Sequence, residues 1–444
     1  MTARLCDIRA CLEGGIPAAI ATCAPDGTPN VVYTSQVHWV DDGHVALSFQ
    51  FFNKTRRNIL ANPYATVLLL DPRTAACWRL HLKYLRTETE GPLFESMKAQ
   101  LAGIASHSGM QDVFRLLGSD IYQVERIEAV PGEPLPVPAP RVGMLPAVRR
   151  CAERLARCQA MDEALNAVMD TLAQGLGIEH AMVLMLDESG QGLYTVASTG
   201  YARSGVGSEI RIGQGVIGVA ARERTPVRIG YMTHASIYSQ AMRGAAGADA
   251  ATEIPYPGLA QPHSQLAVPV MSAGRVLGVL FVESEQDLRF EFEDEDALVA
   301  LAGHLGAVVD VMRQSDDARE ADAAQAPAPP HESRAAAARP LQVRHFASND
   351  SIFVGDDYLI KGVAGAILWK LLREHARKGR TDFTNRELRL DPAIGLPEVG
   401  DNLEARLVLL RRRLEEYGSD LRIEKTGRGR FRLLVNRPVV LAEA

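Results

Sequence analysis

The sequence predicts a multidomain α+β protein that begins with a small β-barrel, continues with an α/β/α sandwich and ends in helices followed by a β-hairpin. Alternating apolar patterns, typical of short strands, recur through the first two thirds of the chain. Proline-rich tracts interrupt them at two places, where neither a helix nor a central strand can form. Because 444 residues are too many for one core at about 150 residues per domain, we expect three folded units.

The composition is that of an ordinary globular protein, with 47% hydrophobic and 23% charged residues. No apolar run approaches the ~20 residues needed to span a bilayer. Charged residues interrupt the N-terminus where a signal peptide would be apolar, so we expect a cytoplasmic protein with no membrane partner. The six cysteines are scattered, with no spacing suited to a metal, and we expect neither structural zinc nor a disulfide framework.

Two stretches separate the expected units. Residues 131–140 hold five prolines and predict a stiff linker. An Ala-, Pro- and charge-rich tract near 315–340 has almost no large apolar residue to bury and predicts a flexible one. The predicted organisation is a barrel at 1–135, a linker at 136–145, a sandwich at 146–314, a second linker at 315–342 and a final unit at 343–440.

In the first unit, five strand patterns separated by tight-turn residues predict the barrel, at 18–23, 31–33, 44–49, 66–70 and 79–85. A short helix after the third strand begins with Lys54, Thr55, Arg56 and Arg57. Free N–H groups at a helix start, together with hydroxyl and guanidinium donors, make an anion site. The alternative, a solvated basic turn, is the commoner use of such spacing.

Residues of about 10–130 resemble the flavin-binding split barrels of the pyridoxamine 5′-phosphate oxidase-like superfamily. The resemblance is carried by the run Gln50-Phe-Phe-Asn-Lys-Thr-Arg-Arg-Asn58, the pair Asn62-Pro63 and the strand at 65–70. It implies a split β-barrel in which Thr55, Arg56 and Arg57 hold the phosphate of FMN, with Lys54 beside them. It also implies that Gln50 and Phe51 flank the flavin and that Arg79 lies near a later strand contact.

The resemblance leaves the cofactor and the activity open. The Trp/Arg segment with which pyridoxal-phosphate-making oxidases hold their substrate does not follow the barrel, so that activity is not implied. The superfamily also includes members that use a deazaflavin or haem in place of FMN. We interpret His38, His81 and His107 as structural, because a lone histidine in a strand or loop is more often structural than a ligand.

The second unit carries a glycine turn that opens a short helix at 213–229 and a hairpin at 264–284, between flanking helices at 146–176 and 293–312. In this order the segments resemble a GAF domain over residues of about 150–313. The resemblance implies a sensor or dimerisation module and does not name the ligand, a small molecule. Cys151 and Cys158 share one face of the first helix; we interpret them as buried and inert rather than as a redox-responsive dimer seam.

The loop at 231–263 is expected to close the pocket of this unit. Its candidate lining residues are Tyr231, His234, Tyr238, Met242 and His263. The alternative is an Ala- and Gly-rich insertion with scattered aromatic residues and no binding role.

The third unit is basic. Residues 361–437 hold eighteen Lys/Arg and eleven Asp/Glu, a net charge of +7 against −13 on the rest of the chain. Its third helix is expected to bury Leu403, Leu407, Leu410 and Leu414 and to expose a flank of Asn402, Arg406, Leu409 and Arg413. Arg pairs with guanine edges and Asn with adenine edges, so this flank suits the major groove of DNA.

The hairpin at 421–434 follows this helix, and its glycines permit a tight turn that places Lys425, Arg428 and Arg430 within reach of phosphates. The run Leu410-Arg-Arg-Arg-Leu414 before a strand, and Thr426-Gly-Arg-Gly429 before an aromatic residue, resemble the OmpR-type winged helix of response regulators. The resemblance implies DNA binding. The alternative is a winged helix that contacts protein.

These units together predict a cytoplasmic, ligand- or redox-responsive transcriptional regulator that dimerises through the helices flanking the GAF domain. The alternative is a flavin-dependent oxidoreductase with regulatory appendages, for which the sequence offers no convincing acid/base pair and hence no catalytic residue. A third possibility is a scaffold whose barrel and GAF pockets bind nothing.

Overall fold

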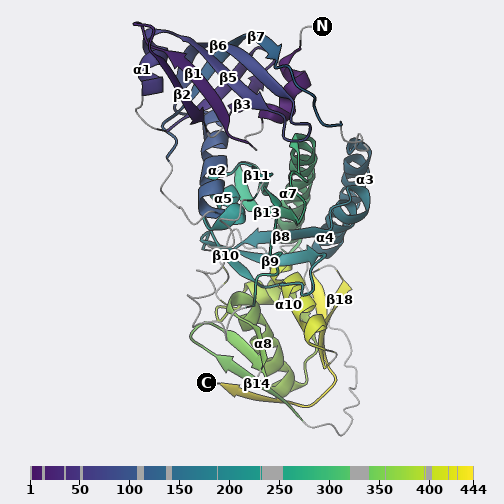
Figure 1. Ribbon diagram of the computed structural model, residues 1–444. Helices are drawn as coiled ribbons and strands as arrows, with labels where there is room; N and C mark the ends of the chain where they lie inside the picture. Colours follow the sequence, from purple (N-terminus) through teal and green to yellow (C-terminus); the bar gives the residue numbers. More distant parts are fainter. Residues whose placement is uncertain are drawn as a thin grey trace.

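The computed structural model describes residues 3–12, 16–34, 37–50, 54–107, 115–136, 143–187, 189–230, 232, 254–320, 340–355, 357–394, 396, 403–418, 420–427 and 429–443, the side chains of 106–107 and 314–320 excepted. Three units follow one another along the long axis of the molecule, with the barrel at one end and the C-terminal unit at the other (Figure 1).

The N-terminal unit is an antiparallel sheet of seven strands in the order β2-β1-β5-β6-β7-β4-β3. The strands are β1 Ala18–Cys23, β2 Pro29–Thr34, β3 Val37–Asp41, β4 His44–Phe49, β5 Tyr64–Leu70, β6 Cys77–Glu88 and β7 Gly118–Ala129. Alternate residues point inward, so Val45, Val67 and Leu80 form a core that the sheet encloses. The 3-10 segment η1 (Leu5–Leu12) and helix α1 (Lys54–Ala61) pack against it.

Helix α2 (Pro92–His107) lies between β6 and β7 in sequence but extends out of the barrel to the middle unit (Figure 1). Ala99 of α2 is fully buried in a cluster formed by the middle unit. A Cβ at Gly103 would lie 2.4 Å from Cγ1 of Val227, so the absence of a side chain permits this close packing. The barrel therefore contributes part of the hydrophobic cover of its neighbour.

The middle unit is an antiparallel six-stranded sheet in the order β10-β9-β8-β13-β12-β11. Its strands are β8 His180–Leu186, β9 Gly192–Thr199, β10 Glu209–Arg211, β11 Val227–Ile229, β12 Ser264–Ser272 and β13 Arg275–Ser284. Helices α3 (Leu145–Leu155), α4 (Met161–Asp170) and α7 (Phe292–Glu320) cover one face of the sheet. Helix α5 (Gly215–Glu223) and α2 cover the other face.

The described residues of the C-terminal unit form two small sheets and three helices. One sheet has the order β16-β15-β14-β20 and the other β17-β19-β18. The elements are β14 Leu341–Phe346, β15 Ser351–Val354, β16 Asp357–Ile360, α8 Gly362–Lys378, β17 Asp382–Thr384, α9 Asn385–Arg389, α10 Leu403–Tyr417, β18 Leu421–Gly427, β19 Arg430–Val435 and β20 Val439–Glu443. The hydroxyl of Thr384 accepts a hydrogen bond from the backbone N–H of Glu387 and so caps the start of α9.

Two expectations about helices are wrong. The helix expected at 146–176 is broken into α3 and α4, because the chain turns between Ala156 and Ala160. A short π-helix, η2 (Thr171–Gly175), follows α4. Cys158 consequently lies beyond the end of α3 and does not share a helix face with Cys151.

Among the described helices, none combines the length and the hydropathy needed to cross a membrane.

Candidate functional site

A partly open cavity of about 150 Å³ lies in the barrel between the start of α1 and strands β1, β2, β4 and β7. It is lined by Ile20, Val32, Tyr33, Thr34, Leu47, Ser48, Phe49, Gln50, Thr55, Arg56, Ile59, Asp120 and Tyr122. The lining combines aliphatic and aromatic side chains with polar ones, and α1 and β7 contribute Thr55, Arg56 and Asp120. Such a combination is typical of a small-molecule or cofactor pocket.

The strongest polar contact in this cavity joins Arg56 to Asp120. Nη1 of Arg56 lies 2.5 Å from Oδ1 of Asp120, and the hydroxyl of Thr87 donates to the same oxygen over 2.6 Å. Burial raises the pKa of Asp120, and the hydrogen bond from Thr87 and the charge of Arg56 only partly oppose the rise. Cζ of Arg56 also lies 4.6 Å from the ring centroid of Phe49. The guanidinium is thus fixed in position at the edge of the cavity.

The other predicted cofactor residues are divided between the cavity and the surface. The hydroxyl of Thr55 lines the cavity and accepts a hydrogen bond of 2.9 Å from Nδ2 of Asn30. Gln50 also lines it, and Phe51 lies outside the described residues. Lys54 and Arg57 are exposed at the start of α1 and do not line the cavity.

Arg79, expected near the flavin, is exposed on β6 with Nη1 3.3 Å from Glu128, and it does not line the cavity. Two residues that sequence reasoning missed, Asp120 and Tyr122, do line it. They lie on β7, a strand that was not predicted.

The donor set fits a flavin mononucleotide. Thr55 and Arg56 supply a hydroxyl and a cation to one end of the cavity, which suits a phosphate. Phe49, Val32 and Tyr122 supply an apolar and aromatic wall, which suits a planar ring system. A phosphate at Arg56 must compete with the carboxylate of Asp120.

The predicted histidines do not meet at this cavity. Nε2 of His81 lies 3.0 Å from Glu128, and the side chain of His107 lies outside the described part of the chain. His38 is buried on β3 at the junction with the middle unit, and burial together with the charge of Arg228 lowers its pKa to about 4.

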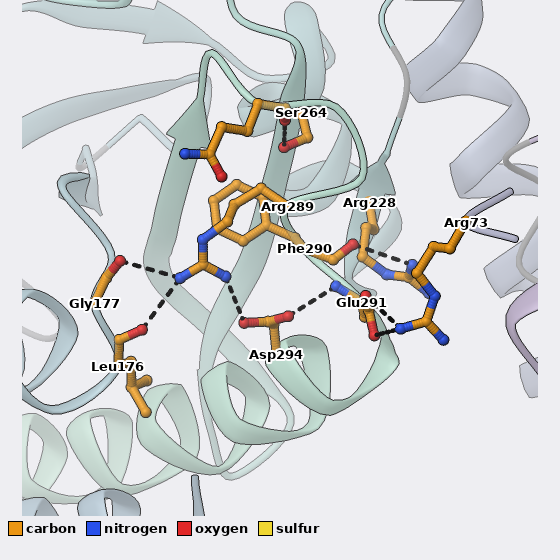
Figure 2. Close-up of polar contacts among 10 residues, drawn as sticks. Arg73, Leu176, Gly177, Arg228, Ser264, Arg289, Phe290, Glu291 and Asp294 are labelled. Atoms are coloured by element: carbon orange, nitrogen blue, oxygen red, sulfur yellow. Dashed lines mark hydrogen bonds and ion pairs between the residues drawn. The ribbon is translucent and has the colours of Figure 1, made fainter. Parts of the chain in front are cut away.

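An ion pair between Arg73 and Glu291 crosses this junction, and further ion pairs hold the start of α7 beside it (Figure 2). Nη1 of Arg73, from the barrel, lies 3.1 Å from Glu291, and Nε of Arg228 lies 2.8 Å from Glu295. Glu291 donates its backbone N–H to the buried Asp294, which also pairs with Arg289 at 3.1 Å. The start of α7 therefore connects the barrel to the sheet of the middle unit.

Of the residues expected to line the pocket of the middle unit, four lie outside the described part of the chain: Tyr231, His234, Tyr238 and Met242. His263 is described, and its Nδ1 lies 3.2 Å from Asp287.

Sequence reasoning missed Glu283, a buried carboxylate at the end of β13. Its oxygens accept hydrogen bonds from the backbone N–H of Leu259 (2.8 Å) and Nε2 of Gln265 (3.0 Å), and burial raises its pKa. Glu283 directly follows the apolar run Val279–Val282 near the end of its strand, where the pattern alone gave no signal of its role.

In the C-terminal unit, the predicted DNA-facing flank of α10 is covered. Cζ of Arg406 lies 3.9 Å from the ring centroid of Tyr194, and Leu409 is only 3% exposed. Arg413 donates to the backbone oxygen of Leu359 and pairs with Glu416. The expectation that this flank is exposed is therefore wrong in this conformation, whereas the predicted burial of Leu403, Leu407, Leu410 and Leu414 is confirmed.

The hairpin β18–β19 remains accessible. Lys425 and Arg430 are exposed, and they also border a small cavity of about 40 Å³ next to Asp162 and Arg411. Asn402 and Arg428 lie outside the described residues.

Comparisons with known proteins identify the first two units. Residues 7–125 match the family model of pyridoxamine 5′-phosphate oxidase, and residues 158–310 match the model of the GAF domain. The chain therefore contains a split barrel of the pyridoxamine 5′-phosphate oxidase type and a GAF domain, as the two resemblances predict. No curated protein sequence matches the chain.

Solved structures with similar folds cover one unit each. The GAF domain of an Acinetobacter phosphoenolpyruvate-protein phosphotransferase is 23% identical, with 38% of this chain and 94% of that chain covered and a TM-score of 0.32. Free methionine-R-sulfoxide reductase from Neisseria meningitidis is 21% identical, with 41% and 98% covered and a TM-score of 0.32. An FMN-binding protein from Syntrophomonas wolfei is 15% identical, with 29% and 86% covered and a TM-score of 0.25.

Proposed function

We propose that this chain is a cytoplasmic transcriptional regulator in which the split barrel and the GAF domain sense a ligand or a redox state and the C-terminal unit binds DNA as a winged helix. The observation that carries the proposal is the C-terminal order of helix α8, short helix α9, helix α10 and hairpin β18–β19 in a segment with a net charge of +7. In a winged helix of this order, the third helix enters the major groove and the hairpin lies along the backbone.

The hairpin supports this assignment. Lys425 and Arg430 are exposed on neighbouring strands, and Lys425 pairs with Phe431 in the register of β18 and β19. Phe431 is buried against Phe383, with ring centroids 6.0 Å apart. The hairpin is therefore packed on the hydrophobic core of its own unit. Cations held on an anchored hairpin suit contacts with phosphates, which position a protein on DNA without reading sequence.

For the sensing part, we propose that the barrel binds FMN. Thr55 and Arg56 would hold the phosphate, and Gln50 and Phe49 would lie beside the ring. When bound, the isoalloxazine ring supplies reversible electron transfer. The residues of this chain hold and orient it, and the apolar wall of Ile20, Val32 and Leu47 keeps water from one side of the cavity. A deazaflavin shares most of these requirements; a haem would need an axial ligand, and neither His38 nor His81 faces this cavity.

We also propose that the chain forms a homodimer through α7. Val299 and Val311 are 43% and 62% exposed, and Gly303 and Ala307, which lie between them at helical spacing, are exposed as well. An apolar stripe of this kind on a helix suits packing against a second helix. A change in the barrel and GAF domain would then alter the spacing of two DNA-binding units across paired half-sites.

The alternative is a flavin-dependent oxidoreductase. The observation that favours it is the carboxyl group of Asp120, whose pKa is raised within the cavity, because an acid/base catalyst needs such a shift. Steady-state turnover of a reduced nicotinamide with an acceptor, abolished by Asp120→Asn, would favour the enzyme.

Two measurements test the proposal. An absorbance spectrum of the purified protein, with mass analysis of what it releases on denaturation, should show a flavin. Titration with a random-sequence duplex of about 30 base pairs at about 50 and 200 mM salt should show binding that weakens as salt rises. A colourless protein with no affinity for the duplex at either salt concentration would refute it.

A further inference from the structure

We infer that the GAF domain of this chain holds helix α10 in a docked, DNA-incompetent position, so that DNA binding requires the C-terminal unit to detach. The inference rests on the proposed function, since it names the surface through which the sensing units would control the winged helix. Figure 1 shows α10 against the sheet of the GAF domain, on the side of β9 and α4.

Charged and polar groups make the first part of this contact. Nη2 of Arg411 lies 2.8 Å from Oδ2 of Asp162 in the first turn of α4. Arg412 donates to the backbone oxygen of Val196 over 2.7 Å and to the side-chain oxygen of Asn166 over 2.8 Å. The two arginines that follow one another on α10 thus bind a carboxylate, an amide and a carbonyl of the GAF domain.

Apolar packing makes the second part. Val408 and Leu409 are each 3% exposed, although they lie on the same helix as the buried leucine stripe of the C-terminal unit. A Cβ at Gly207 would lie 3.5 Å from Cδ1 of Leu409, in contact distance. Arg406 stacks over the ring of Tyr194 at 3.9 Å. Buried residues of the two units belong to one continuous hydrophobic cluster.

Two further polar contacts border the interface. Nζ of Lys361, just before α8, lies 3.1 Å from Glu209 on β10. The hydroxyl of Ser204 donates to Glu416 near the end of α10. Ion pairs therefore connect the units at two separate places, Arg411 with Asp162 and Lys361 with Glu209.

This position excludes α10 from DNA. The major groove is about 12 Å wide and admits a helix, but not a helix whose side is covered by β9 and α4 of the GAF domain. Nη2 of Arg411 and both Nη atoms of Arg412 already donate hydrogen bonds to the GAF domain, so these nitrogens are not directed at base edges or phosphates. Lys425 and Arg430 remain exposed, so the docked protein should keep weak, salt-dependent binding through the hairpin.

The population of the detached state determines how far docking of α10 on the GAF domain raises the apparent Kd for DNA. When only a fraction of the molecules is competent, the apparent Kd rises by the inverse of that fraction. If about 1–10% of molecules are detached, releasing α10 should tighten binding ~10- to 100-fold.

The experiment compares the full chain with variants that change only the GAF side of the contact. Asp162→Arg with Glu209→Arg places like charges opposite Arg411 and Lys361, and a triple variant adds Asn166→Arg opposite Arg412. The control is Asp170→Arg on the same helix, because Asp170 pairs with Arg154 inside the GAF domain and not with α10. Hydrogen exchange of residues 403–417 reports detachment, and fluorescence anisotropy with a random-sequence duplex of about 30 base pairs reports the Kd at about 100 mM salt.

We expect α10 to lose protection in the double and triple variants but not in the control, and the Kd to fall at least ~10-fold in parallel. Loss of protection with an unchanged, measurable Kd would overturn the inference and leave the proposed DNA binding intact. Loss of protection with no binding by any protein would overturn both. Protection that stays unchanged in both variants would show that these contacts do not hold the helix, and would overturn the inference alone.

Discussion

The guanidinium of Arg411 lies 2.8 Å from the carboxylate of Asp162, although 249 positions separate the two residues in sequence. Burial alone would raise the pKa of Asp162, but the hydrogen bond and the charge of Arg411 outweigh it and hold the pKa below its ordinary value. The ion pair links α10, which we propose to read DNA, to the GAF domain. The GAF domain and the C-terminal unit are thus in direct contact.

Removing either partner should weaken this link. Asp162→Ala and Arg411→Ala, combined in a double-mutant cycle on the exchange of α10, should give a coupling free energy of about 1 kcal/mol, because both side chains are still partly exposed. A group with a depressed pKa contributes above its unfolded value near 3.9 and loses its contribution as the pH falls through the folded value. The coupling should therefore stay constant between about pH 5 and pH 8; a coupling that disappears within that range would contradict an Asp162–Arg411 ion pair.

His38 should make the stability of the barrel–GAF junction sensitive to acid. Its pKa is lowered to about 4 by burial and by Arg228, whereas an unfolded histidine titrates near 6.5. As the pH falls from about 6.5 to 4, the unfolded chain takes up the proton first, and roughly 3 kcal/mol of stability is lost.

Urea unfolding followed by tryptophan fluorescence at several pH values measures this loss, since Trp39 adjoins His38. His38→Leu should remove most of the dependence between pH 6.5 and 4. His44→Leu, on the neighbouring strand β4 and partly exposed, is the matched control and should leave it in place. An equal pH dependence in wild type and His38→Leu would show that another group carries it.

Arg56 and Arg57 are neighbours in sequence, but their positions relative to the barrel cavity differ. Arg56 lines the cavity and Arg57 is exposed outside it, so Arg56→Ala should lower FMN affinity at least ~10-fold and Arg57→Ala by much less. Asp120→Asn should not weaken binding, because it removes a negative charge beside the phosphate. Equilibrium titration of the apo-protein with FMN measures all three. A larger loss in Arg57→Ala than in Arg56→Ala would move the phosphate out of this cavity.

Exposed cations of the hairpin should bind phosphates rather than bases. Lys425→Ala and Arg430→Ala should each weaken binding to unrelated duplexes to the same extent and reduce the slope of log K against log salt by about one. Arg422→Ala, exposed on the same strand β18 but nearer its start, provides the comparison. Loss of affinity for one sequence only would instead assign these residues to base reading.

The sequence predicted most of the elements and few of the contacts between units. Strands such as Ala18–Cys23 and His44–Phe49 have local apolar alternation and tight turns, and these signals are sufficient to place them. Strands β3 and β7 and helix α2 were missed. Ala99 of α2 is fully buried, but α2 is covered by α5 and β11 of the GAF domain, more than a hundred positions away. Local periodicity does not report such a partner.

The same limit explains the errors at the sites. Lys54 to Arg57 appeared as one basic cluster, but the helical turn of α1 directs only Thr55 and Arg56 into the cavity. On α10, the spacing placed Leu409 on an exposed flank because one leucine stripe was enough for the core of its own unit. Leu409 is instead buried in a hydrophobic cluster that includes residues of the GAF domain, with Gly207 of that domain next to it.

The measurement that tests the central proposal most directly is sequencing of the duplexes retained by the full chain, and by its Asp162→Arg, Glu209→Arg variant, from a random pool. A dimeric winged-helix regulator predicts enrichment of a motif with two half-sites about 10 base pairs apart, stronger for the variant than for the wild type. A retained pool with the same sequences as the input, for both proteins, would contradict the proposal.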